Sequence, residues 1–411
     1  MRLYLFKIIV FFVPSMAFGW SYDQAYSMLV SNNAEYQNAI VASQSAKLSL
    51  SVAKSLLYPR LDLRAAADRF IQEDASSGYR AFIGPRISAP IYRGGYLLAN
   101  KRAEEARLSQ AELKVSVELL DKTQKLREAF ANALYAKNYL SVARNILNRS
   151  EKNLRLVELK YQSGREYKWV YLTTKTDFEE DRLTVLQAKL DQQKALVSLQ
   201  ELVGELPVSD IQELDEDGFY TAEIPMDAFE HVDLTQHVEY RVETSTLAES
   251  QYKYDMSKSD RFPNISFRMD FVLIDTDDEP IIPFWSTGIS MSMPLFAFNR
   301  YKNEQRMAAL TQSQSELTRV QTLRKLQAEY QKAVNRFQIV QKKLEIAELR
   351  LEALQDRSRV TTEQYKNGLE DFVVWNRSQN ALKSAETQIL EQKKDWMIAY
   401  ATLVRAAGKG L

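Results

Sequence analysis

The side chains that most often carry catalysis and metal binding are scarce in this sequence. Its 411 residues include no cysteine and two histidines, His231 and His237, so thiolate chemistry, disulfides and cysteine-ligated metals are excluded. The two histidines lack the spacing of a zinc-binding helix, and the sequence has neither a nucleophile elbow nor a phosphate-binding loop. Neighbouring carboxylates such as Glu104 and Glu105 fall in helical segments and are interpreted as solvated faces. The sequence therefore predicts no catalytic residue, no metal site, no cofactor and no enzyme.

The charged residues are balanced in number. Lysine and arginine total 54, aspartate and glutamate also total 54, and the formal net charge is zero. A nucleic-acid binder normally carries a basic excess that neutralises phosphates. We therefore expect no nucleic-acid partner.

Glycine and proline are rare, and their positions indicate the elements. The chain has 12 glycines and 10 prolines, about half of the usual share of roughly 12%. Because both residues interrupt helices, the segments without them predict long helices. The segments without glycine or proline are 20–58, 96–163, 165–203, 226–262, 295–367 and 369–407. Their lengths follow a short, long, short order twice, which indicates an internal duplication.

The duplication has a constant offset of 204 residues. The offset relates these pairs: Pro59 and Pro263, Pro90 and Pro294, Tyr161 and Tyr365, Gly164 and Gly368, Gly204 and Gly408. The sequence thus predicts a first repeat over 20–204, a linker over 205–223 and a second repeat over 224–411. Each repeat is expected to contain a helix, a β-hairpin, a long helix and a helix.

The long helices carry a seven-residue periodicity. One row runs every seven residues from Leu119 to Tyr161, and a row of small residues lies three positions away. The small row is Ala129, Ala136, Ala143, Ser150 and Val157. Such paired rows are typical of coiled-coil packing, although an ordinary helical bundle shows them too. A helix of 68 residues would be about 100 Å long.

The segments between short and long helices alternate with period two instead. Apolar and polar residues alternate over 264–273 and 285–293, and more weakly over 61–68 and 83–88. Each segment is long enough for a tilted transmembrane strand, and a soluble hairpin packed on helices is the alternative. Four strands are too few to enclose a pore, so a membrane barrel would need several chains. On the polar faces lie Arg60, Arg64, Arg86 and Arg268, which would line a barrel lumen or face solvent.

The N-terminus has the pattern of a secretory signal peptide over residues 1–19. Arg2 and Lys7 precede an apolar core, and small residues offer cleavage after Ala17 or Gly19. A membrane anchor is the alternative, but the apolar run is short for a span.

Four short motifs carry a family resemblance. They are residues 53–63 before the first strand, 90–95 and 294–300 after each hairpin, 161–164 and 365–368 at the ends of the long helices, and 199–204 at the end of the first repeat. In their order, spacing and duplication the chain resembles the TolC-type outer-membrane efflux proteins over essentially its whole mature length. The resemblance places Pro59, Pro90, Gly94, Gly95, Pro263 and Pro294 at turns between helices and strands.

The resemblance implies a mostly α-helical protein with a small contribution to a membrane β-barrel. Three copies would form one twelve-stranded barrel in the outer membrane and a trimeric α-helical tunnel in the periplasm. The implied partners are a periplasmic adaptor, an inner-membrane pump and outer-membrane lipid. The chain would be a passive exit duct for efflux or type I secretion, and the substrate stays open. A soluble periplasmic helical-hairpin adaptor is the alternative.

The resemblance also marks the helical-hairpin tips as adaptor contact and gate. The residues concerned are Tyr161, Gly164, Tyr365, Gly368, Asp371 and Arg377. Asp371 fits the family's polar residue three positions after the tip glycine, whereas Tyr167 does not. Some members place acids where this chain has Val374 and Arg377, so we predict a pore without a cation-binding acidic gate.

Two further features near the strands have structural interpretations. The acidic run at Asp275, Asp277, Asp278 and Glu279 lacks the spacing of a calcium loop and is interpreted as a solvated external loop. Aromatic residues near strand ends are interpreted either as an interfacial girdle or as local packing. These are Tyr58, Tyr92, Trp285 and Phe296.

Overall fold

The computed structural model describes residues 21–71, 77–204, 214, 229, 232–276 and 281–409. The predicted signal peptide, nearly all of the predicted linker and His231 lie outside these residues. So do Asp277, Asp278 and Glu279 of the predicted external loop.

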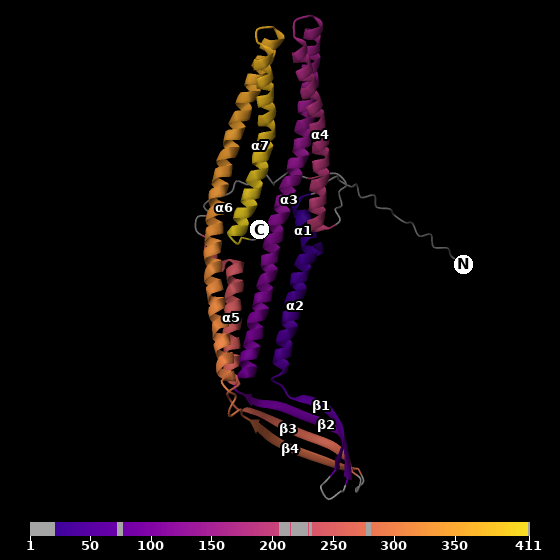
Figure 1. Ribbon diagram of the computed structural model, residues 1–411, viewed down its shortest axis with the longest axis vertical. Helices are drawn as coiled ribbons and strands as arrows, with labels where there is room; N and C mark the ends of the chain where they lie inside the picture. The colour runs from indigo at the N-terminus through magenta and orange to yellow at the C-terminus, as the bar shows by residue number, and fades with distance from the viewer. Residues whose placement is uncertain are drawn as a thin grey trace, which may run out of the picture. The chain divides into compact units, whose positions relative to one another are not determined.

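The helices follow the predicted short, long, short order (Figure 1). They are α1 (Tyr22–Asn32), α2 (Ala34–Ser55), α3 (Tyr96–Gln162), α4 (Lys168–Val203), α5 (Val238–Ser259), α6 (Arg300–Lys366) and α7 (Phe372–Ala406), with a 3₁₀ turn at Leu234–Gln236. The long helices α3 and α6 have 67 residues each. No helix among the described residues is both long and apolar enough to cross a membrane.

The first predicted helix is divided into α1 and α2 at Asn33. Asn33 takes an extended conformation, with φ −68° and ψ 116°. Its side-chain amide donates to the Leu202 carbonyl at 2.9 Å, and that of Asn32 donates to the Val203 carbonyl at 3.3 Å. The last carbonyl groups of a helix have no partner inside the helix. The break in the first helix thus supplies donors to the end of α4.

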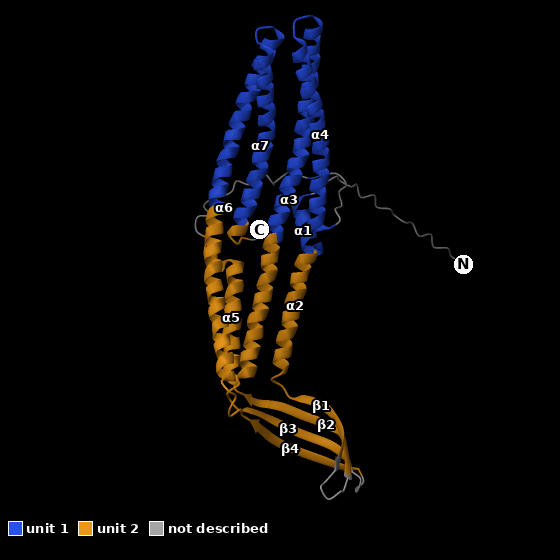
Figure 2. Ribbon diagram, viewed as in Figure 1, with its two compact units in different colours: residues 1–33, 122–226, 333–404 blue, residues 34–121, 227–332, 405–411 orange. Residues whose placement is uncertain are grey.

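The described chain divides into two compact units (Figure 2). The first unit holds α1, α4, most of α7 and the α3 and α6 segments nearest the hairpin tips. Within it, all five members of the predicted small-residue row on α3 are buried. The periodicity therefore marks a packed seam, as predicted.

The second unit contains α2, α5, the other segments of α3 and α6, and a four-stranded antiparallel sheet in the order β1-β2-β3-β4. The strands are β1 (Arg60–Ile71), β2 (Ser77–Arg93), β3 (Asn264–Thr276) and β4 (Ile282–Ser292). The number of strands is as predicted. They are longer than the alternation indicated, and β2 continues through two prolines.

The register separates the two faces of the sheet. Asp62, Arg86, Asp270 and Ser286 form one row across the four strands. The next row, on the opposite face, contains Leu63, Pro85, Phe271 and Trp285. This apolar face is uncovered, with Leu63 74% exposed and Ile289 70% exposed.

Most of the predicted turn residues lie where strands and helices meet. Pro59 precedes β1, Pro263 precedes β3, and Pro294 follows β4. Gly94 and Gly95 form the turn before α3 with φ of +57° and +83°. The prediction that Pro90 lies in a turn is wrong. Pro90 lies inside β2, beside a bulge between Pro90 and Tyr92. A bulge disrupts the ladder locally and so accommodates a residue without an amide hydrogen.

The second repeat makes the equivalent turn without glycine. Phe298 and Asn299, 204 residues after Gly94 and Gly95, have positive φ angles of 40° and 65°. Residues other than glycine rarely adopt this conformation. The backbone of the turn is thus repeated although its residues are not.

Candidate functional site: the helical-hairpin tips

Each hairpin tip turns through a glycine in the left-handed conformation. Gly164 and Gly368 both have φ of +73°. At the first tip the Arg165 amide donates to the Lys160 carbonyl at 2.8 Å. At the second, the Leu369 amide donates to the Gln364 carbonyl at 2.9 Å. These are the bonds of a Schellman cap, so each glycine ends its long helix and lets the chain reverse.

The two tips begin their second helices differently. The Asp371 carboxylate accepts a hydrogen bond from the Val374 amide at 2.8 Å, in the first turn of α7. Tyr167 occupies the N-cap of α4 and makes no side-chain cap bond. The departure seen in the sequence at Tyr167 is therefore a missing cap.

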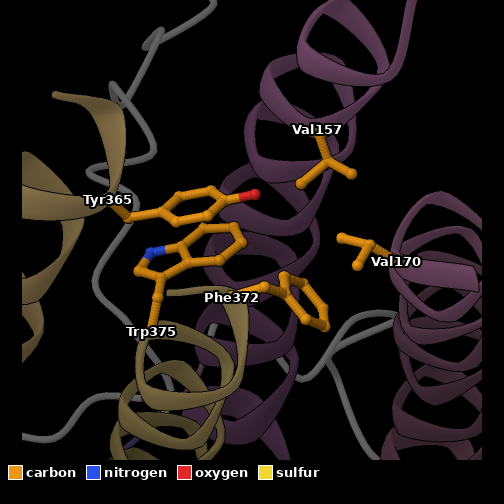
Figure 3. Packing of buried hydrophobic residues seen from close by; sticks show 5 residues of the cluster. All are labelled: Val157, Val170, Tyr365, Phe372 and Trp375. Carbon is orange, nitrogen blue, oxygen red and sulfur yellow. The ribbon is translucent and has the colours of Figure 1, made fainter. Parts of the chain in front are cut away.

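A buried aromatic cluster lies between the two hairpins near their tips (Figure 3). Its members are Val157, Val170, Tyr365, Phe372 and Trp375. The rings of Tyr365 and Trp375 stack with centroids 4.3 Å apart and planes 8° apart. Tyr365 is 1% exposed. Its prediction as an adaptor-contact residue therefore needs correction, because a side chain packed inside the tip offers no surface to a partner.

Tyr365 instead joins the two hairpins. Tyr365 belongs to the α6–α7 hairpin, and its hydroxyl donates to Glu166 Oε1 of the α3–α4 hairpin at 2.7 Å. Lys160 Nζ donates to the Tyr365 carbonyl and lies 3.9 Å from the centroid of its ring. We call Lys160, Glu166 and Tyr365 the tip latch.

Burial changes the acidity of two members of the tip latch. Desolvation, aided by the neighbouring Glu166 carboxylate, raises the pKa of Tyr365 above its ordinary value near 10. Desolvation lowers the pKa of Lys160. The Tyr365 hydroxyl is therefore protonated, and a donor to Glu166, throughout the neutral range.

A polar layer follows the aromatic cluster along α6 and α7. Trp375 Nε1 donates to Thr362 at 3.2 Å, and the Gln379 amide donates to Ser358 at 2.8 Å and to Thr362 at 2.9 Å. The 204-residue offset relates Ser358 to Leu154 of the predicted seven-residue row, but nothing in the sequence identified Gln379 as its partner. This network holds the two helices of the second hairpin together behind the tip.

Two ion pairs further from the tips also cross between the hairpins. Lys383 Nζ lies 2.6 Å from Asp181 Oδ2. Arg149 forms a bidentate pair with Glu386, at 2.9 and 2.6 Å. No local pattern in the sequence indicates either pair, since the two partners are about 200 positions or more apart along the chain.

Several apolar and aromatic side chains are exposed on the outer surface of the tips. At the first tip Tyr167 is 73% exposed, and Trp169 and Leu172 are also exposed. At the second tip the exposed apolar residues are Leu369 and Val373. Tyr161 is exposed as well and stacks on Tyr171 at 5.5 Å. Arg377 is exposed on α7. The tips thus carry an apolar surface in addition to their buried latch.

The predicted lumen arginines all lie on the polar face of the sheet. Arg86 pairs with Asp270 on the neighbouring strand. Arg64 and Arg268 are exposed. They do not contribute to the tips, so the predicted residues form two separate groups, one at the tips and one on the sheet.

Comparison with known proteins identifies the class to which this architecture belongs. Residues 25–205 and 243–409 match the family described as outer membrane efflux protein. The chain belongs to this family, and the matched residues include most of both repeats. No curated protein sequence matches the chain significantly.

Several solved structures share the fold. The Campylobacter jejuni CmeC outer membrane channel has a TM-score of 0.84 at 16% identity, covering 94% of this chain and 85% of that one. The Vibrio cholerae outer membrane protein VceC has a TM-score of 0.84 at 15% identity, with 95% and 96% covered. The open state of the Neisseria gonorrhoeae MtrE outer membrane channel has a TM-score of 0.83 at 16% identity, with 95% and 89% covered.

The protein is therefore an outer-membrane efflux channel of the TolC family, a component of tripartite efflux systems. It lies in the outer membrane and extends into the periplasm. The family is not enzymatic, and its channels are typically trimeric.

Proposed function

We propose that three copies of this chain share one twelve-stranded barrel and form a passive exit duct. The observation that carries the proposal is the four-stranded sheet, whose outer strands β1 and β4 each have one neighbour in the described chain. In a membrane the backbone groups of an open sheet edge have no water to bond, so a spanning sheet must close. Pairing β1 of one copy with β4 of the next closes the sheet.

The exposed apolar face supports lipid contact for this sheet. Leu61, Leu63, Ile289 and Met291 are all at least 68% exposed on it. The opposite face carries the arginine and aspartate side chains. This is the arrangement of a barrel with lipid outside and water inside. The alternative from the sequence is a soluble adaptor. In a soluble protein, an apolar face of this kind would be exposed to water, which is unfavourable.

The aromatic residues near the strand ends fit the same arrangement. Tyr58 is 69% exposed and Phe296 is 76% exposed, so neither packs inside the chain. We infer that they belong to an interfacial girdle, where aromatic rings meet the lipid headgroups.

Oligomeric state and membrane location test this proposal together. We expect the purified protein to fractionate with outer membranes, to have three times the chain mass in native mass spectrometry, and to migrate differently on a gel before and after heating. A soluble monomer would contradict the proposal.

We also infer that the exposed tip surface is where the periplasmic adaptor binds. Because the chain has no cysteine, a single introduced cysteine directs a crosslinker without background. We expect Tyr167→Cys to crosslink to the adaptor in cells. Leu310→Cys, at an exposed position in the second unit, is the matched control. Equal crosslinking from both positions would argue against a tip-specific contact.

Arg377 suggests that the tip mouth lacks an acidic gate. Its side chain is exposed, and Val374 stands at the other position where some relatives have an acid. We expect divalent cations added from the tip side to leave single-channel conductance nearly unchanged. The Arg377→Asp variant is expected to become sensitive to divalent block, because three carboxylates would then meet at the mouth. Strong block of the unmodified protein would contradict the prediction.

A further inference from the structure

The polar face of the sheet carries an excess of positive charge. The strand alternation and register place six arginines on this face: Arg60, Arg64, Arg80, Arg86, Arg93 and Arg268. The acids on the same face are Asp62, Asp68 and Asp270. Each chain therefore has three more positive than negative charges on this face of its described strands, although the whole chain has none in excess.

All three aspartates are already paired. Asp62 lies 2.8 Å from Arg60 Nε, Asp68 lies 3.7 Å from Arg80, and Asp270 binds Arg86. Arg93 stacks over the Tyr96 ring at 4.3 Å. Within the described strands, Arg64 and Arg268 are thus the arginines of this face with neither an acidic nor an aromatic partner.

The residues directly opposite these two arginines on the neighbouring strands are small and uncharged. Gly84 is opposite Arg64 on β2. Ser88 and Gly288 flank Arg268 on β2 and β4. Both guanidinium side chains are exposed. They are therefore free to attract ions from the water in front of the sheet.

The two arginines lie in the half of the sheet nearer the helices. Their rows are on either side of the row that contains Asp62, Arg86 and Asp270. Toward the strand-connecting loops, the same face carries the apolar Phe82 and Ile274 and then the Arg80–Asp68 pair, whose charges cancel. The excess charge is consequently concentrated in one section of the face.

We propose that Arg64 and Arg268 make this channel selective for anions, so that the solutes it passes best are negatively charged. The inference rests on the proposed function, since three copies must close a barrel with the polar face inside. Three copies would then put six unpartnered arginines around one section of the lumen. Rings of charged side chains select ions of opposite sign, and lumen substitutions in such barrels change selectivity.

The proposal predicts a characteristic salt dependence. The Debye length is about 8 Å at 0.15 M salt and about 3 Å at 1 M. Selectivity that arises from fixed arginines is therefore expected to be strong in dilute KCl and to weaken in concentrated KCl.

The test is the reversal potential of the purified full-length channel in planar bilayers under a KCl gradient at low salt. We expect chloride to permeate more readily than potassium. In the double variant Arg64→Gln and Arg268→Gln, the permeability ratio is expected to fall by about twofold or more. The variant Arg64→Lys with Arg268→Lys retains the charge and is expected to keep the ratio.

Arg69→Gln is the matched control, because Arg69 alternates onto the opposite, apolar face of β1. We expect it to leave the ratio unchanged. If the double variant does not assemble, the single variant Arg268→Gln gives the same comparison with about half the effect.

The outcomes separate this inference from the proposed function. Conductance with a preference for potassium, or a ratio unaffected by removing Arg64 and Arg268, would overturn the anion selectivity and leave the channel intact. A folded trimer with no conductance would overturn the duct itself.

Discussion

The two hairpin tips occupy equivalent positions in the repeats, yet their side chains have different roles. Tyr161 and Tyr365 are 204 residues apart, but Tyr161 is 37% exposed and Tyr365 is 1% exposed. The second tip contributes the three rings of the aromatic cluster, the cap at Asp371 and the hydroxyl of the tip latch. The first tip supplies Glu166 and Lys160, and its rings Tyr161, Tyr167 and Trp169 are exposed. The difference indicates that the duplicated tips have diverged, because the buried rings come from the second tip and the exposed rings from the first.

The largest expected effect comes from the core of the second tip. Trp375→Ala removes a buried indole, which costs about 3–5 kcal/mol of stability. Its equivalent in the first repeat is Tyr171, which is partly buried and stacks on Tyr161. Tyr171→Ala is expected to cost about 1 kcal/mol. Amide hydrogen exchange of the helices near the tips measures the loss of stability in each variant. Equal losses in Trp375→Ala and Tyr171→Ala would contradict the difference between the two tips.

The tip latch is expected to have the next largest effect. Tyr365→Phe keeps the ring stacked on Trp375 but removes the bond to Glu166, at a cost of about 1–2 kcal/mol. Because the two hairpins are then less tightly joined, we expect a larger mean single-channel conductance. Tyr161→Phe is the control at the equivalent position and should leave conductance unchanged. An unaltered conductance in Tyr365→Phe would show that the bond to Glu166 does not restrain the tips.

The helix caps are expected to have a smaller effect on stability, and a cap can be removed at one tip and added at the other. Asp371→Ala removes the N-cap of α7 and should cost about 1 kcal/mol, whereas Tyr167→Asp adds a cap to α4 and should stabilise it by about 1 kcal/mol. Hydrogen exchange in the first turn of each helix reports the two effects. Loss of stability in Tyr167→Asp would mean that Tyr167 has a packing role that outweighs the cap.

The smallest effect is expected in alkaline solution. Because the pKa of Tyr365 is raised above 10 in the folded protein, its contribution to stability is complete below pH 10. It is lost as the pH rises further, since the unfolded chain then releases the proton more readily. We expect the melting temperature of the tip to fall less steeply above pH 10 in Tyr365→Phe than in the unmodified protein. Tyr135, whose pKa burial raises to about 12, contributes to the remaining slope in both proteins.

Much of the fold followed from local patterns in the sequence. Glycine and proline positions predicted the helix limits, and period-two alternation predicted the strands. Both are local, because a left-handed turn at Gly164 or a strand face at Leu63 depends on a few neighbouring residues. The limits were less accurate where tertiary contacts intervened. Asn33 divides the first helix because its side chain caps α4, about 170 residues away.

The site was predictable as a location but not as a set of contacts. The sequence located both tips, the missing cap at Tyr167 and the exposed Arg377. It treated Tyr161 and Tyr365 alike, because the duplication gives them the same local surroundings. Their difference depends on Trp375, Glu166 and Lys160, which approach from other segments.

By itself, the sequence determined the order of elements, the duplicated register and the two faces of each strand. These properties arise from backbone propensity and from the spacing of apolar residues. The tertiary structure decided which tyrosine is buried and which hairpins are joined by Lys383 and Arg149. It also decided that every aspartate on the polar face of the described strands pairs with an arginine, which leaves Arg64 and Arg268 with neither an acidic nor an aromatic partner. Pairing across distant segments depends on the register of β2 with β3 and on helix packing, and no local pattern specifies either.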